Sequence, residues 1–104
     1  MKIEVSIPRH DYPAEVRGQV EEKLQRLARY FDRTESIRAL LEQQQHVHRV
    51  ELVASARPGV VLVVDSRADS LSKALDESVD RMSNVLSRHK QKLAKAARRR
   101  EKGG

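Results

Sequence analysis

The sequence predicts an α+β fold, a two-layer sandwich in which two helices cover one face of a four-stranded mixed sheet. Three segments alternate apolar with polar residues and a fourth is a short β-branched run, which is typical of strands. Two longer segments repeat apolar residues every three or four positions, which is typical of amphipathic helices. The segments follow the order β-α-β-β-β-α, so a sheet and two helices can bury one shared core.

The first strand is predicted over residues 2–7, where apolar and polar residues alternate. Pro8 ends this strand because proline cannot donate a hydrogen bond to a neighbouring strand. Pro13 suits the first turn of a helix, and residues 32–34 close that helix. Its apolar stripe falls within an arc of about 80° on a helical wheel and consists of Val16, Val20, Leu24, Leu27 and Phe31.

Three further strands are predicted at 36–41, 47–56 and 60–64. A polar connection at 43–46 separates the first two, and a Pro58–Gly59 turn separates the last two. Because these strands are consecutive and closely connected, we expect them to pair antiparallel. The first strand of the chain is joined to them through a helix, so it can pair in parallel by a right-handed crossover.

The last helix is predicted to begin after a cap at Asp69 or Ser70. Its apolar pattern fades after Ala97, so we expect an α+β domain over 1–95 and a basic, disordered tail over 96–104. The apolar stripe of this helix consists of Leu71, Leu75, Val79, Met82, Leu86 and Leu93, with His89 within it.

The composition excludes several kinds of protein. A chain of 104 residues forms one domain with a modest core. The absence of cysteine excludes disulfides and thiolate metal sites, and it is typical of a cytosolic protein. The N-terminus lacks the apolar segment of a signal peptide, and the longest apolar run, 60–64, is too short to span a membrane. No nucleotide-binding glycine motif or nucleophile motif is present, so we expect a cytoplasmic protein that is not an enzyme and needs no cofactor.

The positive charge lies at the C-terminal end. The chain carries a net charge of +6, whereas residues 88–104 alone, with eight basic residues and one acid, carry +7. Residues 1–87 are therefore close to neutral. A basic segment of this kind is typical of nucleic-acid binding, and an anionic membrane surface is the weaker alternative.

On the helical wheels the basic residues form a ridge on each helix. For the first helix, a solvated outer face that satisfies the helix dipole explains the ridge as well as RNA binding does. If both helices lie on one face of the sheet, the two ridges flank a groove that could follow an RNA backbone. The strands carry no aromatic residue, which argues against a base-stacking sheet. The candidate RNA-binding residues are Lys23, Arg26, Arg29 and Arg33, followed by Arg81, Arg88, Lys90, Lys92 and Lys95.

Two histidines, His46 and His48, share one face of a predicted strand, a spacing that a metal ion can use. No third ligand is evident in the sequence, so we expect no metal site. His89 is expected at the edge of the core.

Three segments resemble a known family: VEEKLQRLARYFDR at 20–33, HRVEL at 48–52 and DSLSKALDESVDRMSNVLSRHKQKL at 69–93. With the MKIEVS start, they resemble the short ribosome hibernation-promoting factors, also called ribosome-associated inhibitors or sigma-54 modulation proteins. The resemblance spans nearly all of 1–95. It implies a fold similar to double-stranded RNA-binding domains.

The resemblance also implies a function. Such proteins bind the small ribosomal subunit between head and body, contact rRNA in the decoding region and obstruct the mRNA and tRNA sites, which silences translation in stress or stationary phase. The partners expected are the small subunit and its rRNA, with no small-molecule substrate and no membrane. The family's basic helix positions correspond here to Lys23, Arg26, Arg29, Arg81, Arg88, Lys90 and Lys92.

The chain departs from the family in several places. Tyr12–Pro13 replace a threonine-type cap, Gly18 replaces a better helix former, and residues 43–46 and the arginine-rich end are its own. The long family form has a C-terminal dimerisation domain that we do not expect here, so we expect a monomer off the ribosome. Two alternatives stay open: a general RNA- or DNA-binding module without ribosome specificity, and a regulatory protein-interaction module.

Overall fold

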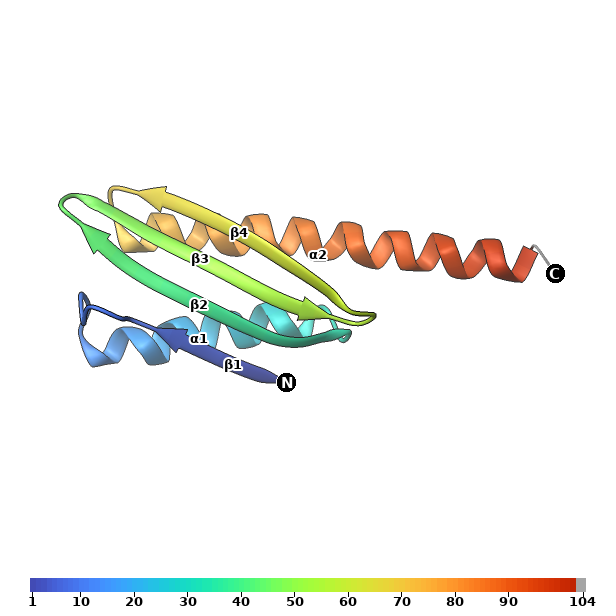
Figure 1. Cartoon of the computed structure of the whole chain (residues 1–104), viewed down its shortest axis with the longest axis horizontal. Coiled ribbons are helices and arrows are strands. Elements are labelled where there is room, and N and C mark those ends of the chain that lie inside the picture. The colour runs from blue at the N-terminus through green and yellow to red at the C-terminus, as the bar shows by residue number, and fades with distance from the viewer. Residues whose placement is uncertain (103–104) are drawn as a thin grey trace.

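The structure is a computed structural model that describes the backbone of residues 1–102 and the side chains of 1–99. Both helices lie on the same side of the sheet, behind it in Figure 1. The predicted α+β class and the predicted order of elements are confirmed. The elements are β1 (Lys2–Ser6), α1 (Ala14–Arg29), β2 (Thr34–Gln44), β3 (Val47–Ala56), β4 (Val60–Ala68) and α2 (Leu71–Lys102).

The sheet has the strand order β1-β2-β3-β4. β1 pairs in parallel with β2, and the β2–β3 and β3–β4 pairs are antiparallel, as predicted. The turn between β3 and β4 places Gly59 at a φ of 64°, a left-handed conformation that glycine adopts without steric cost. β1 and β4 are the edge strands, and each therefore has one side without a neighbouring strand.

β2 and β4 are longer than the sequence predicts. β2 continues to Gln44, which pairs with Val47, and β4 continues to Ala68, which pairs with His48. Both extensions carry mostly polar residues, so apolar alternation stops before the strand does. They remain paired because the long β3 supplies partners, and because an antiparallel sheet can leave one face in water.

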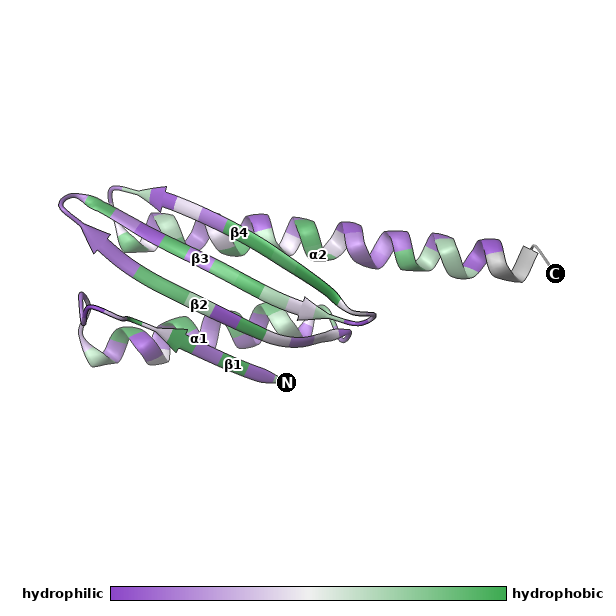
Figure 2. Cartoon of the chain, viewed as in Figure 1, coloured by the Kyte–Doolittle hydropathy of each residue, from purple (hydrophilic) through white to green (hydrophobic). Residues whose placement is uncertain are grey.

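The core is aliphatic and lies between the sheet and the helices. Alternate residues of the strands point into it, and the apolar stripes of both helices cover them. Figure 2 shows the hydrophobic first half of β4 and the alternation of hydrophobic and hydrophilic residues along α2. The fully buried side chains include Val20, Leu24, Ile37, Leu41, Val50, Leu52 and Met82.

α2 begins at a side-chain cap and extends past the sheet. The Ser70 hydroxyl accepts a hydrogen bond from the Lys73 N–H at 3.2 Å, so Ser70 rather than Asp69 caps the helix. Residues 94–99 are all exposed, yet the helix continues to Lys102, where a disordered tail was predicted from residue 96. Alanine, lysine and arginine dominate this stretch and favour the helix without packing.

We call the helical segment 94–102 the overhang; it extends past the body of the molecule in Figure 1. The expected disorder of residues 103–104 lies outside the described residues. The molecule measures 57 × 23 × 18 Å. No helix among the described residues is long and apolar enough to cross a membrane.

Candidate nucleic-acid interface

α1 and α2 lie next to each other on the sheet, and an open groove of about 530 Å³ runs between them. Leu27 of α1 and Val79 of α2 contribute apolar surface to this interhelical groove. Its polar lining comes from both helices. These residues are Lys23, Arg26, Tyr30, Asp76, Asp80 and Ser83.

Three of the nine predicted RNA-binding residues have partners within the protein. Lys23 Nζ lies 2.7 Å from Asp76 Oδ1 and so joins α1 to α2. Arg26 pairs with Glu22 one helical turn earlier, at 2.9 Å. Arg81 donates to the backbone carbonyl of Asp65, at 2.9 Å. Each of these side chains already contributes to the fold.

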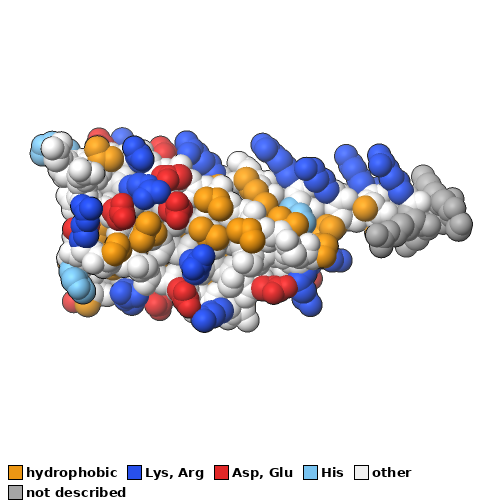
Figure 3. All heavy atoms as spheres, viewed as in Figure 1, with side chains coloured by type: hydrophobic (Ala, Val, Ile, Leu, Met, Phe, Trp, Pro, Cys, Tyr) orange, Lys and Arg blue, Asp and Glu red, His pale blue; other side chains and the backbone are white. Residues whose placement is uncertain are grey.

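The other six are exposed, and within residues 1–99 none of them has an ion-pair or side-chain hydrogen-bond partner. Arg33 and Lys90 are brought together, because both line a small apolar pocket beside Phe31 and Leu86. Figure 3 shows Lys and Arg side chains along the part of α2 that extends past the sheet. The six residues are Arg29, Arg33, Arg88, Lys90, Lys92 and Lys95.

The opposite, solvent-facing side of the sheet has balanced charge. Its centre is Arg49, which contacts Asp65 at 2.7 Å, Glu51 at 3.1 Å and Glu42 at 3.3 Å. The hydrogen bond to Asp65 is the main reason that the pKa of Arg49 is raised above its ordinary value. Figure 3 shows acidic, basic and hydrophobic side chains mixed on this face. Excess positive charge therefore belongs to the helical side and the overhang.

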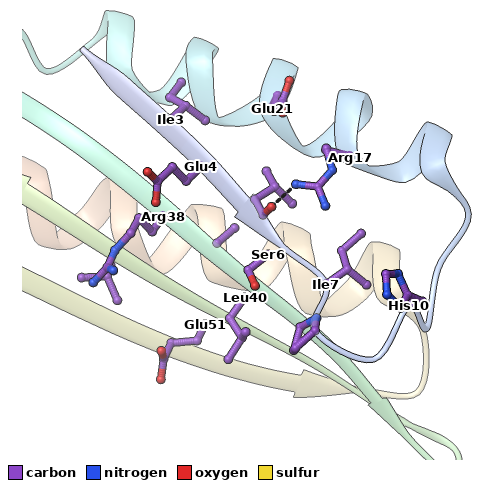
Figure 4. Close-up of a pocket in the computed structure, with 14 residues that line it drawn as sticks. Ile3, Glu4, Ser6, Ile7, His10, Arg17, Glu21, Arg38, Leu40 and Glu51 are labelled. Atoms are coloured by element: carbon purple, nitrogen blue, oxygen red, sulfur yellow. Dashed lines mark hydrogen bonds between the residues drawn. The ribbon is translucent and has the colours of Figure 1, made fainter.

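Arginines from the two helices bind the two edges of the sheet. Figure 4 shows Arg17 of α1 reaching the backbone carbonyl of Val5 on β1. Arg81 of α2 does the same to Asp65 on β4. Edge strands expose unpaired backbone N–H and C=O groups, which can pair with a strand of another chain. These two arginines therefore fasten the helices to the sheet and cover part of each edge.

Two of the four histidines, His48 and His89, have hydrogen-bond partners for their side chains. Tyr12 Oη lies 2.7 Å from His48 Nδ1 and donates to the carbonyl of Glu42 at 3.1 Å, which ties the loop before α1 to the β2–β3 hairpin. Burial raises the pKa of Tyr12, and the nearby Asp11 carboxylate raises it further. His89 is half-buried, with Nε2 3.3 Å from the Arg57 carbonyl. Among the described residues, no group of three or more potential ligands could hold a metal ion.

Sequence reasoning missed Tyr30, whose ring lines the interhelical groove and is 76% exposed. Helical spacing selects apolar and basic positions, so it does not single out an exposed tyrosine at the end of α1. One signal was available, because Tyr30 falls outside the apolar stripe of its own helix while its neighbour Phe31 falls within it.

Comparison with known proteins gives a consistent result. Residues 3–94 match the family described as Sigma 54 modulation protein / S30EA ribosomal protein. A ribosome hibernation promoting factor from Azotobacter vinelandii is 27% identical over 92 residues, which cover 88% of this chain and 85% of that protein.

Two solved structures share the fold. A ribosomal subunit interface protein from Coxiella burnetii superposes with a TM-score of 0.78 at 21% identity, over 88% of this chain and 99% of that one. The N-terminal domain of Protein Y from Thermus thermophilus superposes with a TM-score of 0.68 at 28% identity, over 85% and 94% of the two chains.

Proposed function

The chain belongs to the Sigma 54 modulation protein / S30EA ribosomal protein family, and we propose that it is a ribosome hibernation factor. It binds the small ribosomal subunit at the decoding region through rRNA, blocks the mRNA and tRNA sites, and so inhibits translation in stress or stationary phase. It acts in the cytoplasm as a monomer, by occupying a site and not by catalysis. The relative from Azotobacter vinelandii bears the name of this function.

The observation that carries the proposal is the separation of charge between the two sides of the molecule. The solvent-facing side of the sheet has its central arginine surrounded by three carboxylates. The helical side and the overhang carry exposed basic residues without partners among residues 1–99, and six of these are predicted RNA-binding residues. A polyanion therefore gains most by binding the helical side.

The nine candidate residues do not contribute equally. Binding a phosphate releases condensed counterions and requires no internal ion pair to break at Arg29, Arg33, Arg88, Lys90, Lys92 or Lys95. Lys23 and Arg26 would have to exchange a carboxylate for a phosphate. Arg81 supports the sheet edge as well. We therefore assign the main rRNA contacts to the six residues without partners.

The test is co-sedimentation with purified small subunits at increasing salt concentration. We expect the double variant Arg88→Glu/Lys92→Glu to lose binding, because it reverses two charges without internal partners. The matched control is Arg38→Glu/Arg67→Glu, which makes the same change in net charge on the solvent-facing side of the sheet. This control should bind and sediment as the unchanged protein does.

Circular dichroism of both variants establishes that the fold is intact. Equal loss of binding in both variants would show that only net charge matters, and unchanged binding of Arg88→Glu/Lys92→Glu would refute the assigned surface. A free RNA duplex that competes as well as intact subunits would favour the general RNA-binding module. Inhibition of translation in a cell-free reaction then tests the consequence of binding.

A further inference from the structure

We propose that the interhelical groove holds one unpaired nucleobase, stacked on the ring of Tyr30 and hydrogen-bonded through its amino group to Asp80. The inference rests on the proposed function and deepens it. The basic ridges would contact phosphates, whereas the groove between them would contact a base. The ligand class is thus single-stranded RNA with an exposed cytosine, adenine or guanine.

Tyr30 combines an exposed aromatic side chain with an ordered backbone, the two properties that base stacking requires. It is the most exposed large hydrophobic side chain among the described residues, at 76%. Its backbone is nevertheless fixed, because its N–H donates to the Leu27 carbonyl at the end of α1 and the neighbouring Ala28 and Phe31 belong to the core or pack against it. The backbone that carries the ring is therefore already ordered, which lowers the entropic cost of binding a ligand there.

The groove beside Tyr30 suits a planar, partly apolar ligand. Leu27 and Val79 provide apolar surface, and Arg26 provides a guanidinium plane on the same lining. Bases stack on aromatic rings and on guanidinium groups. The volume of about 530 Å³ lies within the usual range for small-ligand sites.

The acids in the groove favour a base over a phosphate. Asp76 is paired with Lys23, whereas Asp80 is exposed and has no ion-pair or hydrogen-bond partner within residues 1–99. A carboxylate repels phosphate but accepts a hydrogen bond from an exocyclic amino group. Cytosine, adenine and guanine carry such a group and uracil does not. Paired bases inside a duplex cannot reach the ring, so the base must be unpaired.

The first experiment measures affinity for small subunits. We expect Tyr30→Ala to weaken binding about 5- to 150-fold, the range for loss of one stacked base, with no change in the dependence of affinity on salt. Tyr30→Phe keeps the ring and should retain most of the affinity. Val61→Ala is the matched control, because Val61 is 63% exposed on the opposite side of the sheet.

The second experiment uses oligocytidine and oligouridine as single-stranded probes. The chain has two tyrosines and no tryptophan, so in a Tyr12→Phe background the emission of Tyr30 alone reports binding. We expect oligocytidine to quench this emission and to bind more tightly than oligouridine. Asp80→Ala should make the affinities for oligocytidine and oligouridine equal, because it removes the acceptor for the cytosine amino group. It lowers the repulsion of the phosphate backbone equally for the two probes.

Each outcome decides one proposal. If Tyr30→Ala binds subunits as tightly as the unchanged protein, or if Tyr30→Phe loses as much as Tyr30→Ala, stacking is refuted and the hibernation function stands. If oligouridine quenches and binds as well as oligocytidine, the role of Asp80 is refuted. If the unchanged protein does not bind subunits, the hibernation function fails, and the oligonucleotide experiment still tests the groove.

Discussion

At the scale of single residues, internal partners separate basic side chains that look alike in sequence. Arg81 and Arg88 are seven positions apart on one helix, and both are predicted from the sequence to bind RNA. Arg81 donates to the Asp65 carbonyl on an edge strand, whereas Arg88 has no partner within residues 1–99. Helical spacing does not show which residue of α2 reaches a backbone carbonyl of the preceding strand, so periodicity alone could not make this distinction.

This difference predicts opposite results for two alanine variants. Arg81→Ala should lower the free energy of unfolding by about 1 kcal/mol, since it removes an exposed charge-assisted hydrogen bond, and should weaken subunit binding less than Arg88→Ala does. Arg88→Ala should leave stability unchanged. Urea unfolding and co-sedimentation at low temperature measure the two effects. A destabilised Arg88→Ala, or an Arg81→Ala of unchanged stability, would contradict the assignment.

At the scale of elements, the sequence predicts the segments that have a buried apolar pattern. It does not predict the helix and strand ends that lack such a pattern. Alternation of apolar residues located β1 and β3, and the apolar stripes located both helices, although α1 ends at Arg29 and not at residues 32–34 as predicted. The far ends of β2 and β4 were missed because polar residues there are held by pairing with β3. The overhang was missed because its helix rests on the propensity of alanine, lysine and arginine, and because no side chain of residues 94–99 is buried.

The overhang gives a test that leaves charge unchanged. Replacing Ala96 and Ala97 by glycine should destabilise this part of the helix by about 1 kcal/mol per substitution, and the helical circular dichroism signal should fall. If the helix presents its basic residues in a fixed geometry, affinity for small subunits should fall severalfold at constant net charge. Unchanged affinity would show that the overhang acts as a flexible basic tether.

At the scale of the whole molecule, the sheet separates two surfaces of different character. One side carries the helices, the groove and the six predicted RNA-binding residues that have no partner among residues 1–99. The other carries the Arg49 network and two exposed valines, Val61 and Val63, at 63% and 57% exposure. Because charge is balanced on that side and positive on the other, the molecule should bind a polyanion in one orientation.

The absence of native cysteine makes this orientation measurable. A cysteine at Ser83 lies on the groove lining, and one at Val63 lies on the opposite side of the sheet. In the subunit complex we expect Ser83→Cys to react with a maleimide at least tenfold more slowly than in the free protein, because rRNA covers the groove. Val63→Cys should react at the same rate in both states. Protection of Val63→Cys with continued reactivity of Ser83→Cys would mean that the sheet faces the ribosome. The charge separation would then serve a different partner, and the helical layer would be open to solvent in the complex.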